Sequence, residues 1–329
     1  YSGQSYNESI LSSVAGIIGM IPDGLVLLTS ISLTVGVIKM ASKKVIIQKL
    51  SGIELLACVD TLCLDKTGTI TDGTMEVVDV INLDRRVNIN NIVSSIASFE
   101  GNNTDKALID FFGNKSNLKI LKRVPFSSAR KYSLIETDSG IYAMGALEYI
   151  TKKKLHEFSQ LNEYIERGYR ILSLVNCLDH FDKDKNKLLG VIVLKDNIRK
   201  NAKETLEYFK EQNVEIKIIS GDNPITVSNI LKQISIKNYE RYISGDELPL
   251  EFDKLKEVVD NYTIFWRVTP HQKQLIVMAL KEKKTVGYIG DGVNDILALR
   301  EADCSIAMAS GSEAARNVSQ LVLLDSNFS

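Results

Sequence analysis

Apolar residues dominate positions 9–38 of the chain, and a single acid interrupts them. From Ser9 to Ile38 the only charged residue is Asp23. Because about 20 apolar residues cross the hydrocarbon core of a bilayer, this pattern predicts a transmembrane helix with its flanks at residues 1–45. The alternative is a buried helix of a soluble domain. Lysines follow the apolar run, and the positive-inside bias then places the rest of the chain in the cytoplasm. They are Lys39, Lys43, Lys44 and Lys49.

Two helix-disrupting residues flank this acid. Pro22 lacks a backbone donor and frees a carbonyl one turn earlier, and Gly24 lets another group approach the backbone. Freed carbonyls beside the Asp23 carboxylate form a set of oxygen ligands of the kind that hard cations prefer. Acids within a membrane usually line an ion or proton path. Asp23 is therefore a candidate cation ligand; the other interpretation is a carboxylate near a helix end that reaches the membrane interface.

Beyond Lys49 the pattern changes to short aliphatic runs that alternate with helical stretches. The runs end in Asp, Gly or Ser, and the helical stretches lie near residues 224–234, 270–284 and 312–319. Such alternation predicts an α/β fold, a doubly wound parallel sheet whose strand C-termini face one crevice. The strands are expected within 58–69, 214–223, 283–295, 304–312 and 319–327.

The stretch between residues 75 and 189 has a different pattern. Longer alternating strands are expected within 131–147 and 170–181, together with two or three helices, and these strands do not end in acids. We therefore expect an inserted α+β domain at 75–189. It would separate two parts of the sheet domain, at 46–74 and 190–329.

Acidic residues stand at the ends of the expected strands. Asp65, in LDKTGTIT, ends an apolar strand, where an exposed carboxylate can attack a phosphoryl group and form an acyl phosphate. Asp291 and Asp295 share the loop GDGVND, where they can hold Mg²⁺ against the phosphate. An acid at a strand end is most often a turn or cap residue, but four polar clusters at four strand ends of one sheet favour a phosphate site.

The remaining polar groups narrow the kind of phosphate chemistry. Lys273 can neutralise phosphate charge, and Ser220 with the amide of Gly221 can donate hydrogen bonds to phosphate oxygens. Thr67 stands two residues after the expected nucleophile, where a phosphatase would carry an acid to protonate the leaving group. With a threonine there the phosphoenzyme should persist, which suits coupling to a conformational change. No GxxxxGK[ST] string occurs, so a P-loop site is excluded.

Over nearly its whole length the chain resembles the P-type cation-transporting ATPases, in particular the subgroup that includes bacterial calcium-pump-like members. IPDGL (21–25) resembles the Pro-Glu-Gly-Leu motif of the fourth transmembrane helix, whose acid binds the transported ion. The resemblance implies a haloacid-dehalogenase-like fold for the sheet domain. The other matching strings are DKTGTIT (65–71), DNIR (196–199), SGDN (220–223), RVTPHQK (267–273) and GDGVNDILAL (290–299).

The resemblance also implies a role for each matching residue. Asp65 is the phosphorylated aspartate, and Mg²⁺ is held by Asp65, the Thr67 carbonyl and Asp291. The residues implied to contact the phosphate are Thr67, Ser220, Gly221, Lys273 and Asn294, while Asp222 and Asp295 support the site.

The expected insertion resembles the nucleotide-binding domain of the family, which implies ATP as substrate. FSSARKYS (126–133) resembles the adenine-binding stretch, in which Phe126 stacks on the base and Lys131 lies near the nucleotide. Judged by itself, Phe126 would be an ordinary core aromatic. MGALE (144–148), with Gly145, resembles the Lys-Gly-Ala-Pro-Glu loop, but Met144 replaces its lysine, so that ATP binding is either weaker or rests on Lys131. Two arginines match family residues that reach the ATP phosphates: Arg170 and Arg199.

The leading hypothesis is ATP-driven cation transport through an aspartyl-phosphate intermediate, by a multi-pass membrane protein with cytoplasmic catalytic domains. No Thr-Gly-Glu string occurs, so the actuator domain and most transmembrane helices are expected elsewhere in the same full-length protein. The transported cation and the lipid bilayer are the other expected partners. The helix has no Cys-Pro-Cys pattern, which argues against a soft-metal pump.

Two other classes of protein stay open. One is a membrane-tethered haloacid-dehalogenase-like phosphohydrolase without transport, and the other is a non-enzymatic ion-binding or regulatory membrane protein. A nucleic-acid-binding protein is excluded, because the formal net charge is -1 and no basic stripe with interleaved aromatics occurs.

Overall fold

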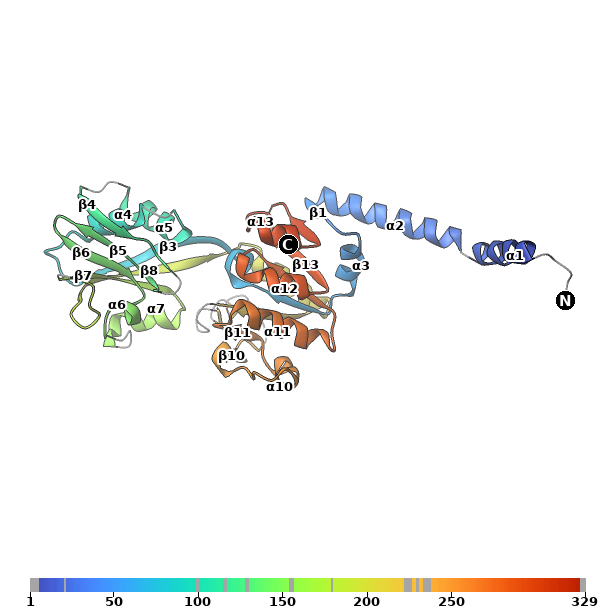
Figure 1. The fold of residues 1–329 in the computed structure, drawn as a ribbon. Helices are drawn as coiled ribbons and strands as arrows, with labels where there is room; N and C mark the ends of the chain where they lie inside the picture. Colours follow the sequence, from blue (N-terminus) through green and yellow to red (C-terminus); the bar gives the residue numbers. More distant parts are fainter. Residues whose placement is uncertain are drawn as a thin grey trace.

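Two β-sheets organise the chain in the computed structural model (Figure 1). The structure describes residues 6–20, 22–98, 101–114, 117–127, 130–153, 157–178, 180–221, 227–228, 231–232 and 238–325, and for residue 23 the backbone alone.

Among the described residues, the first sheet has eight strands, seven of them parallel, and the edge strand β1 pairs antiparallel with β14. The expected doubly wound parallel sheet is therefore confirmed. Each aliphatic run that was expected to form a strand does so. In spatial order the strands are β1 (Val45–Ile47), β14 (Leu321–Leu323), β13 (Cys304–Met308), β12 (Val286–Gly290), β2 (Thr61–Leu64), β9 (Glu215–Ser220), β11 (Ile264–Trp266) and β10 (Tyr242–Ser244).

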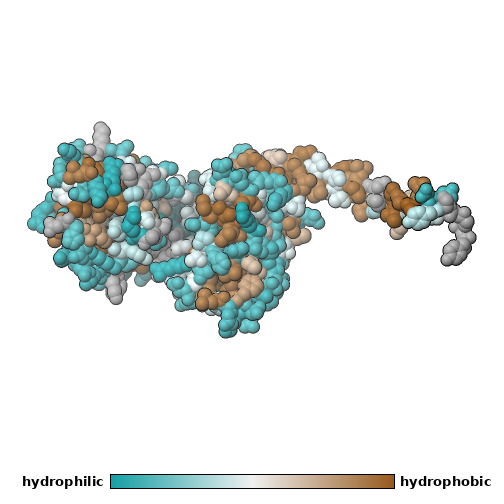
Figure 2. Space-filling model, in the orientation of Figure 1, coloured by the Kyte–Doolittle hydropathy of each residue, from teal (hydrophilic) through white to brown (hydrophobic). Residues whose placement is uncertain are grey.

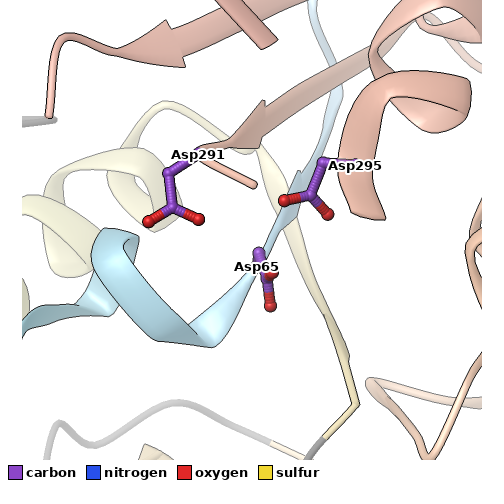
Figure 3. Close-up of side chains that lie close together, drawn as sticks. All are labelled: Asp65, Asp291 and Asp295. Atoms are coloured by element: carbon purple, nitrogen blue, oxygen red, sulfur yellow. The ribbon is translucent and has the colours of Figure 1, made fainter. Parts of the chain in front are cut away.

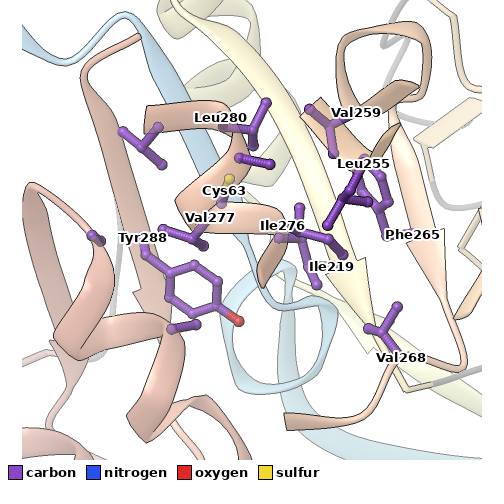
Figure 4. Close-up of a cluster of buried hydrophobic side chains, with 14 of the residues drawn as sticks. Cys63, Ile219, Leu255, Val259, Phe265, Val268, Ile276, Val277, Leu280 and Tyr288 are labelled. Atoms are coloured by element: carbon purple, nitrogen blue, oxygen red, sulfur yellow. The ribbon is translucent and has the colours of Figure 1, made fainter. Parts of the chain in front are cut away.

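Helices bury both faces of this sheet, which is why its strands read as continuous apolar runs. Leu62 and Leu64 of β2 belong to one core, which also takes side chains from α3 and α8. Cys63, between them, belongs to the opposite core, beneath α10, α11 and α12 (Figure 4). The helices are α3 (Ser51–Cys58), α8 (Ala202–Glu211), α10 (Phe252–Val258), α11 (Pro270–Lys281), α12 (Ile296–Glu301) and α13 (Glu313–Val318).

The second sheet is antiparallel, and helices again pack on both of its faces. Helices α4 (Ile89–Ala97) and α5 (Asn103–Phe112) cover one face, and α6 (Leu147–Ile150) and α7 (Asn162–Glu166) cover the other. In spatial order the strands are β3 (Thr71–Asn82), β8 (Lys187–Ile198), β7 (Arg170–Cys177), β6 (Gly140–Gly145), β5 (Tyr132–Thr137) and β4 (Ile120–Val124).

Strands β3 and β8 join the two sheets (Figure 1). They lie side by side, and their register pairs Thr71 with Ile198 and Asn82 with Gly190. Both strands run through the domain boundaries expected near residues 75 and 189. The division of the chain into the units 46–74, 75–189 and 190–329 stays a prediction.

The apolar N-terminal stretch forms two exposed helices rather than one, α1 (Tyr6–Gly19) and α2 (Asp23–Ser42). Pro22 is the N-cap residue of α2, where its missing backbone N–H costs no helical hydrogen bond. Gly24–Ser42 is the one described helix that is long and apolar enough to cross a membrane. Its exposed apolar side chains form the brown band of Figure 2 that projects from the body.

Candidate active site

The polar strand ends expected to form a site meet at one edge of the parallel sheet. Asp65 follows β2 and Asp291 follows β12, and these two strands are hydrogen-bonded neighbours. Together with the end of β9 and the first turn of α11 they surround a cavity of about 330 Å³. The expected residues that line it are Asp65, Thr67, Ser220, Gly221, Lys273, Asp291, Asn294 and Asp295.

Three carboxylates converge in this cavity (Figure 3). Asp65, Asp291 and Asp295 each place one oxygen within 4.8 Å of the others. Burial raises the pKa of Asp65 to about 7, although the Lys273 ammonium opposes the shift. Burial and then the charge of Asp295 raise the pKa of Asp291 to about 6. The site therefore concentrates negative charge and requires a cation to keep these carboxylates ionised.

Lys273 is the cation that the chain itself supplies. Its Nζ lies 3.1 Å from Asp65 Oδ2 and 2.7 Å from Asp295 Oδ1, and its side chain is only 4 % exposed. Burial alone would lower the pKa of Lys273, but Asp65 and Asp295 hold it above its ordinary value. The lysine is placed by the start of α11, where Pro270 is the first residue and Thr269 with Gln272 forms a capping box.

Asp295 is the innermost of the three acids and is fully buried. Its Oδ1 accepts hydrogen bonds from Lys273 Nζ and from the Tyr288 hydroxyl at 2.8 Å, and its Oδ2 accepts one from the Gly292 amide at 3.1 Å. A carboxylate that already has three donors is a poor ligand for an ion. Asp65 and Asp291 are better placed to bind one.

The donor set fits a hard cation such as Mg²⁺. Asp65 and Asp291 offer carboxylate oxygens. Thr67, in the loop Lys66–Ile70 that follows Asp65, lines the same cavity. Oxygen ligands of this kind suit Mg²⁺, which is commonly held by one or two carboxylates together with phosphate oxygens. Gly68 makes this arrangement possible: at its φ of +75°, a Cβ atom would lie 1.7 Å from Asp291 Oδ2.

Two further sets of contacts connect the loop Lys66–Ile70 to the end of β8 and the residue that follows it. Lys66 Nζ pairs with Asp196 Oδ2 at 2.6 Å, and both side chains are nearly buried. The guanidinium of Arg199 donates to the carbonyl oxygens of Gly68 at 2.7 Å and Thr69 at 2.8 Å. Asp196 lies in β8 and Arg199 follows it, so the strand that enters from the second sheet is fastened to the loop beside Asp65.

A second cavity, of about 530 Å³, lies against the second sheet. Four of the residues expected to bind nucleotide line it, and Gly221 lines both cavities. A Cβ on Gly145 would lie 2.4 Å from the Lys131 carbonyl oxygen, so this backbone approach requires glycine. Met144 is largely buried in the adjoining core and also lines the cavity. The four expected residues are Phe126, Lys131, Gly145 and Arg170.

One described residue that was expected to bind nucleotide is not brought to the second cavity. Arg199 is not among the described residues that line the second cavity; it contacts the loop after Asp65 instead. Asp222 lies outside the described residues, and so does the side chain of Asp23.

The sequence analysis assigned no role at the site to Tyr288, Lys66 or Asp196. Tyr288 occupies an interior position of an apolar strand, where a tyrosine looks like a core residue. Lys66 and Asp196 are 130 positions apart, so only the fold brings them together. Their signal in the sequence is that each lies inside or beside a motif. Tyr288 stands two residues before GDGVND, Lys66 is the second residue of DKTGTIT, and Asp196 is the first residue of DNIR.

Comparisons with known proteins identify the family and the fold. Residues 59–303 match a family model described as haloacid dehalogenase-like hydrolase. The chain is 40% identical to a probable cation-transporting ATPase of Streptococcus pneumoniae, over 99% of this chain and 43% of that relative. It is 36% identical to a calcium-transporting ATPase of Mycobacterium bovis, over 98% of this chain and 42% of that relative. The chain thus spans less than half the length of these relatives.

Solved structures share the fold. A crystal structure of a zinc-transporting PIB-type ATPase in its E2.Pi state aligns with a TM-score of 0.61, over 89% of this chain and 43% of that chain, at 18% identity. Together with the relatives, this match confirms the predicted resemblance to P-type cation-transporting ATPases and the haloacid-dehalogenase-like fold.

Proposed function

We propose that this chain, which belongs to the haloacid dehalogenase-like hydrolase family, is the catalytic part of an ATP-driven cation pump that works through an aspartyl phosphate. The observation that carries the proposal is the cavity in which Asp65, Lys273 and Asp291 meet. The names of the relatives from Streptococcus pneumoniae and Mycobacterium bovis support cation transport.

In this proposal the Asp65 carboxylate attacks the γ-phosphorus of ATP. A bond forms between a carboxylate oxygen and phosphorus, the bond from phosphorus to the bridging oxygen breaks, and ADP leaves with that bond's electron pair. Lys273, 3.1 Å from Asp65, balances the charge that gathers on the transferred group. Ser220 and the amide of Gly221 donate to its oxygens. Bound Mg²⁺, held by Asp65, Asp291 and the Thr67 carbonyl, would supply further charge neutralisation.

The second cavity is the proposed ATP site. Phe126 lines this cavity and is 45% exposed, so its ring is accessible for stacking on a base. Lys131 and Arg170 offer positive charge for the phosphates. Because Gly221 lines both cavities, a nucleotide held there can direct its γ-phosphate towards Asp65.

The membrane part of the proposal rests on α2. An apolar helix of this length would place the protein in a bilayer, with both sheets in the cytoplasm and further helices and an actuator domain supplied by the rest of the protein. Asp23, at the start of α2, is the proposed ligand of the transported cation. Calcium is the first candidate, because a calcium-transporting ATPase is among the relatives.

Labelling with γ-phosphate-labelled ATP tests the catalytic proposal. We expect the full-length protein to incorporate label in a hydroxylamine-sensitive, Mg²⁺-dependent form, and Asp65→Asn to abolish it. Asp72→Asn, an exposed acid in the following strand, is the control and should label normally. Rapid phosphate release without a trapped intermediate would instead favour the phosphohydrolase, and no label or turnover would favour the regulator. Thr67 argues against the phosphohydrolase, because it offers no acid to speed hydrolysis.

An ion screen tests the transport proposal. Phosphoenzyme formation should depend on one cation in the full-length protein, and Asp23→Ala should remove or shift that dependence. If Asp23→Ala leaves the ion dependence unchanged, the proposed ion ligand is wrong.

A further inference from the structure

Tyr288 is the largest fully buried side chain among the described residues, and its hydroxyl points at the active site from inside the core. The ring packs between β12 and α11, among Cys63 and Val277 (Figure 4). Burying a phenol is favourable only if its hydroxyl finds a partner. Here the partner is Asp295 Oδ1, at 2.8 Å.

The oxygen that accepts from Tyr288 is the same oxygen that accepts from Lys273, at 2.7 Å. Burial, and next the charge of Asp295, hold the pKa of Tyr288 well above its ordinary value, so the tyrosine acts as a neutral donor. Asp295 is fully buried, and a buried carboxylate is costly unless hydrogen-bond donors satisfy its oxygens. The hydroxyl supplies part of that requirement without adding charge.

Lys273 is shared between two acids, with a shorter contact to Asp295 than to Asp65. Without the Tyr288 hydroxyl, Asp295 would depend more heavily on Lys273 and would draw the ammonium towards itself. The Lys273 ammonium would then lie farther from Asp65 and from a group transferred to it. A neutral donor on Asp295 thus keeps the cation available at the nucleophile.

We propose that Tyr288 is a positioning residue for phosphoryl transfer, which sets how Lys273 is divided between Asp295 and Asp65. The inference rests on the proposed function, because it concerns the step in which Asp65 is phosphorylated. Tyr288 itself is not among the described residues that line the cavity around Asp65 or the second cavity. It therefore acts through Asp295 and has no contact of its own with the nucleotide.

Tyr288→Phe tests this role, because it keeps the ring and removes only the hydroxyl. In single-turnover experiments on the full-length protein at saturating ATP and Mg²⁺, the rate constant of phosphoenzyme formation should fall about tenfold, the scale of one hydrogen bond to a buried charge. The ATP concentration that gives half the maximal rate should stay unchanged. Tyr142→Phe is the matched control: Tyr142 is also buried and its hydroxyl donates to the Ser139 carbonyl, but it lies in the core of the second sheet. Its rate constant should equal that of the unsubstituted protein.

The amplitude of the reaction separates positioning from a general loss of structure. A variant that merely folds less well forms less phosphoenzyme, but its folded fraction reacts with an unchanged rate constant. Unchanged rate constants in Tyr288→Phe, with or without a lower amplitude, would overturn the inference. Failure of the unsubstituted protein to form a hydroxylamine-sensitive phosphoenzyme would overturn the proposed function instead, so the two failures are distinguishable.

Discussion

Lys66 Nζ and Asp196 Oδ2 lie 2.6 Å apart, in an ion pair whose side chains are 1% and 8% exposed. Lys66 directly follows the proposed nucleophile, and Asp196 lies near the end of β8. The pair thus connects the loop beside Asp65 to one of the two strands that join the sheets. A movement of the second sheet that displaces β8 would act directly on this loop.

Asp196→Asn should be strongly destabilising, because it removes the carboxylate charge that faces a buried ammonium. We expect the free energy of unfolding to fall by about 3 kcal/mol, measured by urea denaturation. The control is Glu76→Gln, which removes an acid from the exposed 3.8 Å pair with Lys195 on the same two strands. That change should cost less than about 1 kcal/mol. Equal effects of the two substitutions would mean that the buried pair contributes no more than a surface pair.

Gly68→Ala should disable the site by direct collision. The new Cβ would lie only 1.7 Å from Asp291 Oδ2, and the alanine would have to adopt the positive φ of residue 68. We expect Mg²⁺-dependent phosphoenzyme formation to fall at least a hundredfold, because Asp291 must move. Gly73→Ala is the control: its φ of +80° is equally unfavourable, but its Cβ would meet only Asn103 Nδ2, at 3.5 Å. It should cost about 1 kcal/mol of stability and leave the labelling rate unchanged.

The second sheet should lose stability at low pH through Asp84. Hydrogen bonds from Arg86, and next from Lys187, hold the pKa of Asp84 well below its usual range. In the unfolded chain an aspartate takes up its proton near pH 4. The stabilisation is therefore complete above about pH 5 and declines as the pH falls further towards the lower pKa of the folded protein.

The urea midpoint measures this dependence. The unsubstituted protein should have a higher midpoint than Asp84→Asn at pH 7, and the difference should shrink at pH 3. Asp138→Asn, at an exposed turn of the same sheet, should give the same small difference at both pH values. A difference for Asp84→Asn that does not change with pH would show that the carboxylate charge is not the cause.

The sequence predicted the parallel sheet and the residues around Asp65 because both follow from short-range patterns. An aliphatic run followed by an acid marks the C-terminal end of a buried strand, and parallel strands bring such ends to one edge. The contacts that organise the site from behind could not be predicted in this way. Tyr288 looks like a core residue until its hydroxyl is seen against Asp295, and Asp196 meets Lys66 only through the pairing of β3 with β8. Pro22 allowed the position of the disruption in the N-terminal helix to be predicted. The sequence did not predict that the apolar stretch would form two separate helices there.

Arg199 is the residue for which resemblance and geometry lead to different expectations. The resemblance implies an arginine that reaches the ATP phosphates, whereas here the guanidinium donates to the carbonyls of Gly68 and Thr69. Arg170, by contrast, lines the second cavity. If these positions persist during turnover, Arg199→Gln should slow phosphoenzyme formation about tenfold at saturating ATP without changing the half-saturating ATP concentration. Arg170→Gln should mainly raise that concentration.

Arg199→Lys sharpens the comparison, because lysine keeps the charge but loses the planar fork that reaches two carbonyls. If the backbone contacts are what matters, Arg199→Lys should be nearly as slow as Arg199→Gln. If charge near the phosphates is what matters, Arg199→Lys should recover most of the rate, and Arg199→Gln should behave like Arg170→Gln. That second outcome would mean that Arg199 leaves the loop and contacts the nucleotide during the reaction. Of the two side-chain contacts described above, the buried pair of Lys66 with Asp196 would then be the one that still holds the loop Lys66–Ile70 during phosphoryl transfer, so this pair would matter more than the Arg199 guanidinium.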